Sequence, residues 1–197
     1  MFGNSPSEPA QKATELFEQE GLHNVLELGA GMGRDTKLFA LHGFKVTAVD
    51  YAPGVLSGLK TKLTNLNLTD SVDTIQADVR KGLPFSDASF DACYSHMLFC
   101  MALTMAELEL SMREVHRVLR PGGLCIYTAR HKGDSHFGVG VHHGEDLYEL
   151  NGFIIHFFDS LKLTKLAEGF EVVDIEKFEE GSLPRRLYLV ILRKMEN

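Results

Sequence analysis

The chain has 197 residues, 44% of them hydrophobic and 24% charged, with a net charge of −7. This length suits one domain, residues 1–197, with a substantial core. The negative charge and scattered Lys and Arg argue against nucleic acid as a partner, which needs a basic patch. Three cysteines without metal-type spacing favour a reducing compartment, and the longest apolar run is too short to span a bilayer. We therefore expect a soluble cytoplasmic protein with no membrane partner.

Residues 1–23 are expected to hold one amphipathic helix. Met1–Pro9 has the composition of an irregular start, and apolar residues then fall on one face between residues 10 and 20. Such a helix either covers a cofactor cleft as a lid or packs against a sheet. The sequence leaves both alternatives open.

A strand, a glycine loop and a helix are predicted next. Val25–Leu28 is a short apolar strand that contains Glu27, and a helical pattern runs from Arg34 until Gly43. The loop between them holds Gly29, Gly31 and Gly33. Glycine lets a backbone pack closely against a nucleotide because it has no Cβ and tolerates positive φ. A second strand, residues 44–49, ends at Asp50, where an acid is placed to bind both ribose hydroxyls.

At this point the sequence resembles the class I S-adenosylmethionine-dependent methyltransferases, whose first motif reads like Val-Leu-Glu-Leu-Gly-x-Gly-x-Gly. Residues 25–33 follow that spacing, with Glu27 two positions before the first glycine. The dinucleotide fingerprint is instead Gly-x-Gly-x-x-Gly. The resemblance implies an α/β fold with a Rossmann-like doubly wound sheet of seven strands. Their implied order is 3-2-1-4-5-7-6, with an antiparallel last strand.

The remaining elements agree with this fold. Helices are predicted at residues 53–66, 105–119 and 160–169, the second opened by a capping box between Thr104 and Glu107. Strands are predicted at residues 71–77, 90–95, 124–128, 170–178 and 186–192, with an acidic turn, 179–184, between the last two. Residues 83–91, Leu-Pro-Phe-Ser-Asp-Ala-Ser-Phe-Asp, also resemble a segment of the same family.

The resemblance implies S-adenosylmethionine as the cofactor and S-adenosylhomocysteine as the product. It also implies that Asp78 accepts from the adenine amino group and that the next backbone N–H, of Val79, meets a ring nitrogen. A turn-capping role for Asp78 and an exposed Arg34, rather than one reaching the cofactor carboxylate, are the alternatives. The predicted cofactor residues are Glu27, Gly29, Gly31, Gly33, Arg34, Asp50, Tyr51, Asp78, Val79 and Ser95.

His96 is the predicted catalytic residue. It follows the fourth strand, and in a doubly wound sheet ligands sit at the carboxyl ends of the strands. Histidine is the usual general base near neutral pH, although a neutral histidine bonded to a nearby carbonyl is the alternative. Residues 95–98 read Ser-His-Met-Leu. This differs from the Asn-Pro-Pro-Tyr of enzymes that methylate adenine or glutamine amino groups and from the Pro-Cys of cytosine C5 enzymes.

Residues 131–158 form a long polar connection where the common fold needs only a short one, so we predict a substrate-binding insert. Its predicted substrate residues are His131, His136, His142, His143, Tyr148 and His156. Imidazole with Glu or Asp also suits zinc or iron, and exposed loop histidines are a third alternative. No pair has the spacing of a strong metal motif, so no metal ligand is assigned.

The predicted function is transfer of a methyl group from S-adenosylmethionine to a small-molecule acceptor. A nicotinamide-dependent oxidoreductase would use the same glycine loop and Asp50, and a non-catalytic regulatory module would keep the cofactor residues without a productive pocket. The sequence leaves the acceptor atom and the oligomeric state open.

Overall fold

The structure is a computed structural model that describes residues 5–181 and 185–196. The elements in chain order are α1 (Glu8–Gln19), β1 (Asn24–Leu28), α2 (Arg34–Leu41), β2 (Lys45–Asp50), α3 (Pro53–Asn65), β3 (Val72–Gln76), the 3₁₀ turn η1 (Val79–Lys81), β4 (Phe90–Ser95), α4 (Met105–Val118), β5 (Leu119–His131), β6 (Val141–His142), β7 (Leu147–Leu150), β8 (Phe153–Phe158), α5 (Ser160–Leu166), β9 (Phe170–Glu180) and β10 (Arg185–Lys194).

The strands form one mixed sheet. Its order is β3-β2-β1-β4-β5, and β10 and then β9 continue it beyond β5. The pairs among β1 to β5 are parallel, whereas β10 is antiparallel to both neighbours. With β9 as the sixth and β10 as the seventh core strand, the predicted order 3-2-1-4-5-7-6 is confirmed. The difference is an additional ribbon of β6, β7 and β8 from the predicted insert.

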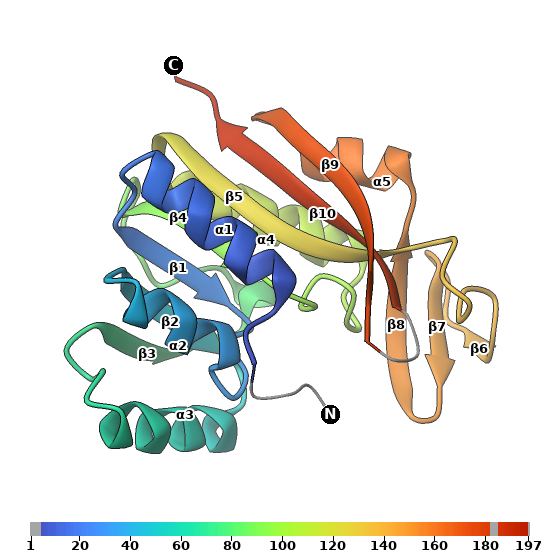
Figure 1. The fold of residues 1–197 in the computed structure, drawn as a ribbon. Helices are drawn as coiled ribbons and strands as arrows, with labels where there is room; N and C mark the ends of the chain where they lie inside the picture. The colour runs from blue at the N-terminus through green and yellow to red at the C-terminus, as the bar shows by residue number, and fades with distance from the viewer. Residues whose placement is uncertain (1–4, 182–184, 197) are drawn as a thin grey trace.

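Helices cover both faces of the sheet (Figure 1). On one face, α1 and α2 contribute Phe17 and Phe39 to a buried cluster. On the other face, α4 and α5 contribute Met112 and Leu163 to a second one. The ring of Phe17 lies 5.9 Å from those of Phe39 and Phe44, so α1 packs on the sheet. A lid role for residues 1–23 stays a prediction.

Two elements, α1 and β5, begin at least two residues before their predicted starts. α1 begins at Glu8 because the Ser7 hydroxyl caps it, accepting from the Ala10 backbone N–H at 3.1 Å. β5 begins at Leu119, since a register irregularity between Phe90 and Ala92 accommodates residues 120–123. The start Met1–Asn4 and positions 182–184 of the predicted turn lie outside the described residues.

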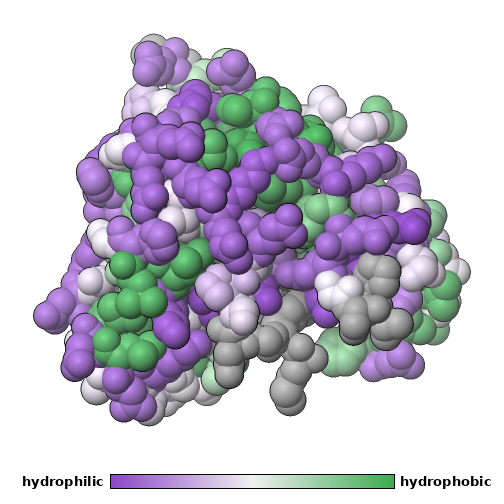
Figure 2. Space-filling model, in the orientation of Figure 1, coloured by the Kyte–Doolittle hydropathy of each residue, from purple (hydrophilic) through white to green (hydrophobic). Residues whose placement is uncertain are grey.

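Hydrophilic side chains cover most of the face drawn in Figure 2, and hydrophobic ones gather there in separate patches. Within residues 5–181 and 185–196, no helix has the length and apolar character needed to cross a membrane.

Candidate functional site

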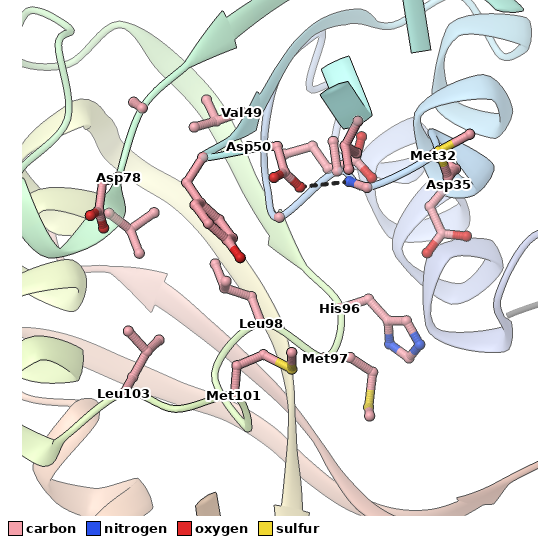
Figure 3. A pocket seen from close by; sticks show the side chains of 18 of the residues that line it. Met32, Asp35, Val49, Asp50, Asp78, His96, Met97, Leu98, Met101 and Leu103 are labelled. Atoms are coloured by element: carbon pink, nitrogen blue, oxygen red, sulfur yellow. Dashed lines mark hydrogen bonds between the residues drawn. The ribbon is translucent and has the colours of Figure 1, made fainter. Parts of the chain in front are cut away.

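A cavity of about 770 Å³ lies at the carboxyl ends of β1 to β4. Figure 3 shows Asp78 at one end of it, His96 and Met97 at the other, and Asp50 between them. Leu98, Met101 and Leu103 line the side opposite Asp50. The volume is in the range of small-molecule and cofactor sites, and this edge of the sheet is where doubly wound folds bind ligands.

The glycine loop forms the wall between β1 and α2. Gly29, Gly31 and Gly33 all have positive φ, of 74°, 55° and 69°, which favours glycine at each position. A Cβ on Gly33 would meet the Leu59 side chain at 2.1 Å, whereas one on Gly31 would find no atom closer than 4.0 Å. Gly33 is therefore needed for packing, and Gly31 leaves open space toward the cavity.

Asp50 connects the glycine loop to the start of α3. Its Oδ2 accepts from the Gly31 backbone N–H at 3.0 Å, and its Oδ1 accepts from the Ala52 N–H at 3.0 Å. A carboxylate has about four lone-pair positions, so both oxygens keep acceptor capacity for a ligand. The structure thus places the predicted ribose-binding acid at the middle of the cavity with its orientation fixed.

Glu27 lines the cavity from β1 and is only 3% exposed. Burial, followed by the nearby Asp35 carboxylate, raises the pKa of Glu27 to about 8, although the Thr36 hydroxyl donates to its Oε2. Glu27 therefore holds a proton near neutral pH. A cationic ligand group beside it would favour the ionised form.

Glu27→Gln should change how stability depends on pH. Between the ordinary pKa of 4.5 and about 8, native Glu27 holds a proton that the unfolded chain has lost, so wild-type stability falls as pH rises. Glutamine does not titrate, and its amide oxygen can still accept from Thr36. We expect urea unfolding to show that the free energy of unfolding of the variant, relative to the wild type, is higher at pH 8 than at pH 5. The expected difference is about 1.4 kcal/mol or more, the free energy of one pKa unit. Parallel pH dependences would contradict this assignment.

Asp35 occupies the first turn of α2 and is 5% exposed. Its Oδ1 accepts from the Ser7 N–H and its Oδ2 from the Ser7 hydroxyl, both at 2.8 Å, and the Tyr94 hydroxyl donates to Oδ2 at 3.2 Å. Arg34 approaches from the next position, with its Nε 3.3 Å from Asp35 Oδ1. A buried negative charge therefore stands where a dinucleotide fold would place its pyrophosphate, at the start of the helix after the loop.

The opposite end of the cavity is formed by Asp78, Val79 and Arg80, with Tyr51 nearby. Asp78 caps η1 by accepting from the Arg80 backbone N–H at 3.1 Å, so the turn-capping alternative describes a real contact. The same carboxylate also lines the cavity, as its predicted adenine-binding role requires. Tyr51 lines it with 66% of its surface exposed, and its carbonyl accepts from Gln76 Nε2 at 3.1 Å.

His96 follows β4, and its two ring nitrogens contact a residue of β5 and a residue of β9. Its Nδ1 is 3.1 Å from the Thr128 hydroxyl, and its Nε2 is 3.1 Å from Glu180 Oε1. The Met97 backbone N–H donates to Thr128 Oγ1 at 2.9 Å, and Met97 has a positive φ of 65°. Burial alone would raise the pKa of Glu180, but the hydrogen bond to His96 and the charges of Arg34 and Arg185 together lower it.

Gly33 and Ser95 are the two predicted cofactor residues outside the described lining of the cavity. Ser95 is the last residue of β4. It is 2% exposed, and its hydroxyl donates to the Leu28 carbonyl at 3.0 Å. This bond joins the ends of β4 and β1. Its effect on the cavity is therefore through the strands that carry the glycine loop and His96.

None of the insert residues in the described part of the chain lines the cavity. His142 stacks on Tyr148 at 4.7 Å, His143 pairs with Glu149 at 2.9 Å, and His131 accepts from the Gly133 N–H at 2.9 Å. His136 Nδ1 lies 3.2 Å from Arg130 Nη2. The six predicted substrate residues are therefore dispersed, and their contact with an acceptor stays a prediction. No group of three or more potential metal ligands occurs within residues 5–181 and 185–196.

His156 does not line the cavity, but it bonds the backbone of a segment that does. It is fully buried in β8, where its Nδ1 donates to the Leu103 carbonyl at 2.6 Å and its backbone N–H donates to the Cys100 carbonyl at 3.0 Å. Lys162 Nζ donates to its Nε2 at 2.8 Å. Burial and the Lys162 charge lower the pKa of His156, so the ring is neutral near pH 7. The insert therefore fixes the backbone of the segment that carries Leu98, Met101 and Leu103.

Sequence reasoning missed Glu180 and the buried role of Asp35. Glu180 belongs to an acidic run that reads as a surface turn, and it meets His96 across 84 positions of sequence. Asp35 reads as a helix-favouring first-turn acid, and its partner Ser7 is 28 positions away. The sequence gives one local signal for such residues. His96 and the glycine loop each follow a predicted strand, so they lie at the carboxyl edge of the sheet, where side chains distant in sequence come together.

The chain is similar to known proteins in sequence and in fold. A family model described as a methyltransferase domain matches residues 26–127. The chain is 32% identical over 114 residues to a sterol 4-C-methyltransferase of Caenorhabditis elegans, covering 58% of this chain and 33% of that protein. It is 31% identical over 104 residues to a malonyl-acyl-carrier-protein O-methyltransferase of Erwinia billingiae, covering 53% and 38%. The chain thus spans well under half the length of these curated relatives.

Two solved structures share the fold at low sequence identity. A SAM-dependent methyltransferase of Methanosarcina mazei has a TM-score of 0.75 at 20% identity, covering 88% of this chain and 93% of that chain. The 1,6-didemethyltoxoflavin N1-methyltransferase of Burkholderia thailandensis, solved with its namesake compound and S-adenosylhomocysteine, has a TM-score of 0.73 at 21% identity, covering 96% and 79%. Together with the family match, these likenesses confirm the resemblance found in residues 25–33.

Proposed function

The chain belongs to the methyltransferase domain family, and on that premise we propose that it transfers a methyl group from S-adenosylmethionine to a small-molecule acceptor. One observation carries the proposal: the glycine loop, Asp50 and Asp78 line the same cavity, with Asp50 between the other two. The names of relatives point to the acceptor class, since they include a sterol and 1,6-didemethyltoxoflavin.

The charges of the cavity suit this cofactor. Four acidic residues, Glu27, Asp35, Asp50 and Asp78, and three basic ones, Arg34, Lys62 and Arg80, line it. S-adenosylmethionine brings a sulfonium and an ammonium group as positive charges and a carboxylate as a negative one. Lys62 is engaged with the carbonyls of Met32 and Gly33 at 3.2 and 3.4 Å. A dinucleotide would instead bring two phosphate charges against the Asp35 end of the glycine loop, where like charges disfavour binding. This argues against the oxidoreductase alternative.

The cofactor contacts follow from these positions. Asp50 would bind the ribose hydroxyls, and Asp78 with the Val79 N–H would bind the adenine edge. Glu27 would face the amino group and Arg34 the carboxylate of the methionine part. The bound cofactor supplies an electrophilic methyl group on sulfur. The chain's own contribution is to orient it and to exclude water, and such positioning lowers a reaction barrier by several kcal/mol.

His96 is our candidate for removing a proton from the acceptor. It lines the end of the cavity beyond the glycine loop, beside Met97. Because both ring nitrogens lie 3.1 Å from protein partners, Thr128 and Glu180, the ring would accept a proton only by exchanging one of them. The Glu180 carboxylate can only accept, so Nε2 carries the ring proton, and the lone pair that would take a proton is on Nδ1, beside the Thr128 hydroxyl.

The proposal is tested by incubating the protein with methyl-labelled S-adenosylmethionine and a panel of apolar small molecules that carry hydroxyl, amine or thiol groups. Label should appear in at least one panel member, with S-adenosylhomocysteine formed in equal amount. His96→Ala should bind S-adenosylhomocysteine normally and lose turnover about a hundredfold, the usual contribution of a general base. Tight cofactor binding without transfer to any panel member would instead favour the non-catalytic module.

A further inference from the structure

The carboxylate of Asp78 is held by the side chain two positions later. Arg80 Nε donates to Asp78 Oδ1 and Arg80 Nη2 donates to Asp78 Oδ2, both at 2.8 Å. With the Arg80 backbone N–H at 3.1 Å from Oδ1, three hydrogen bonds fix one carboxylate. Bidentate pairing of this kind sets the plane of a carboxylate as well as its position. Both side chains line the cavity.

The Asp78 carboxylate keeps one acceptor position that a ligand can use. A carboxylate offers about two lone pairs on each oxygen. On Asp78, Oδ1 receives two protein donors, whereas Oδ2 receives one. The remaining position on Oδ2 has a direction fixed by the guanidinium. An amino group is a suitable partner for it, and a carbonyl oxygen is not.

We propose that Arg80 is a positioning residue for base recognition, which aims Asp78 Oδ2 at an amino group and so makes the cavity select adenine. The inference rests on the proposed function, because it takes the ligand base to be that of S-adenosylmethionine. Arg80 acts through Asp78 and does not itself read the base.

The surroundings fit a role in selectivity better than one in stability. The Arg80 side chain is 45% exposed, and exposed ion pairs contribute little to folding. The hydrogen bond from Arg80 is the main cause of a lowered pKa of Asp78, as expected for a carboxylate held by a guanidinium. A loss of Arg80 therefore leaves the fold intact and releases the orientation of Asp78.

The test measures binding of two ligands by calorimetry, S-adenosylhomocysteine and S-inosylhomocysteine, which differ in carrying a 6-amino or a 6-oxo base. Wild type should prefer the adenine ligand by about a hundredfold or more, because a 6-oxo group faces a carboxylate it cannot bond. Arg80→Ala should weaken the adenine ligand about tenfold through lost preorganisation and leave the inosine ligand nearly unchanged. The preference should therefore shrink about tenfold.

Two controls separate positioning from a general effect. Lys81→Ala, at the next position of the same turn, should keep both affinities within about twofold of the wild type. In an Asp78→Ala background, adding Arg80→Ala should change nothing, since the residue it acts through is gone. Equal weakening of both ligands by Arg80→Ala, or the same loss in the Asp78→Ala background, would overturn the inference. A wild type that binds neither ligand would refute the proposed function itself, and the inference with it.

Discussion

Asp50→Ala should weaken binding of S-adenosylhomocysteine by about a hundredfold or more. A hydrogen bond to a charged group contributes about 1.5–3 kcal/mol, and two ribose hydroxyls would both bond this carboxylate. At 1.4 kcal/mol per factor of ten, losing them accounts for about two orders of magnitude in the dissociation constant. The variant also loses the bonds from Asp50 to the Gly31 and Ala52 N–H groups, each at 3.0 Å, which hold the loop in shape.

Asp73→Ala is the matched control for this experiment. Asp73 lies on the adjacent strand β3, its side chain is 61% exposed, and its charge partner is Lys45 at 3.4 Å. Asp73→Ala removes the same charge from the same region, and Asp73 does not line the cavity. Calorimetry should therefore find an affinity for S-adenosylhomocysteine near that of the wild type. Near-normal affinity in Asp50→Ala would refute the assignment of the ribose site, and with it the placement of the cofactor along β2.

Asp134→Ala should reduce the free energy of unfolding by about 3–5 kcal/mol, as expected when one member of a buried ion pair is removed. The side chains of Arg130 and Asp134 are 5% and 0% exposed. Asp134 accepts from Arg130 Nε and Nη2 at 3.1 and 2.6 Å, and from the His136 and Arg186 N–H groups at 2.9 and 2.8 Å. The substitution leaves a buried guanidinium without its carboxylate where the insert joins β5 and β10.

Urea unfolding measures this loss, and Asp174→Ala is its control because the Asp174 side chain is 44% exposed and lies 3.7 Å from Lys12. Burial alone would raise the pKa of Asp134, but the bonds from Arg130, His136 and Arg186 lower it below 3.8. The stabilisation is therefore present above about pH 4 and is lost as pH falls through the lowered pKa. The free energies of unfolding of the wild type and Asp134→Ala should therefore converge in acid. A loss under about 1 kcal/mol at neutral pH would contradict a buried, charged pair.

The parts of the site that the sequence predicted are those fixed by local geometry. A strand, a glycine loop and an acid at the next strand tip are close in sequence, and Gly29, Gly31 and Asp50 do line one cavity, while their contacts with a cofactor stay a prediction. The strand order followed from the family, and the family, the fold and S-adenosylmethionine as the family's cofactor are confirmed.

What the sequence could not show is set by long-range pairing. The insert has no helical or strand period that marks its fold, yet it forms an antiparallel ribbon in which Leu147 pairs with His156. That register turns His156 toward the Leu103 carbonyl rather than into the cavity. Glu180 at the end of β9 meets His96 across 84 positions of sequence, a side-chain contact that the predicted strand order alone does not specify.

The most direct measurement is calorimetric titration of the purified protein with S-adenosylmethionine, S-adenosylhomocysteine and NAD. The placement of the glycine loop, Asp50 and Asp78 along one cavity predicts micromolar binding of both adenosyl ligands and no detectable heat from NAD. Binding of NAD with silence from the adenosyl ligands would contradict the account, and the glycine loop would then be a dinucleotide site.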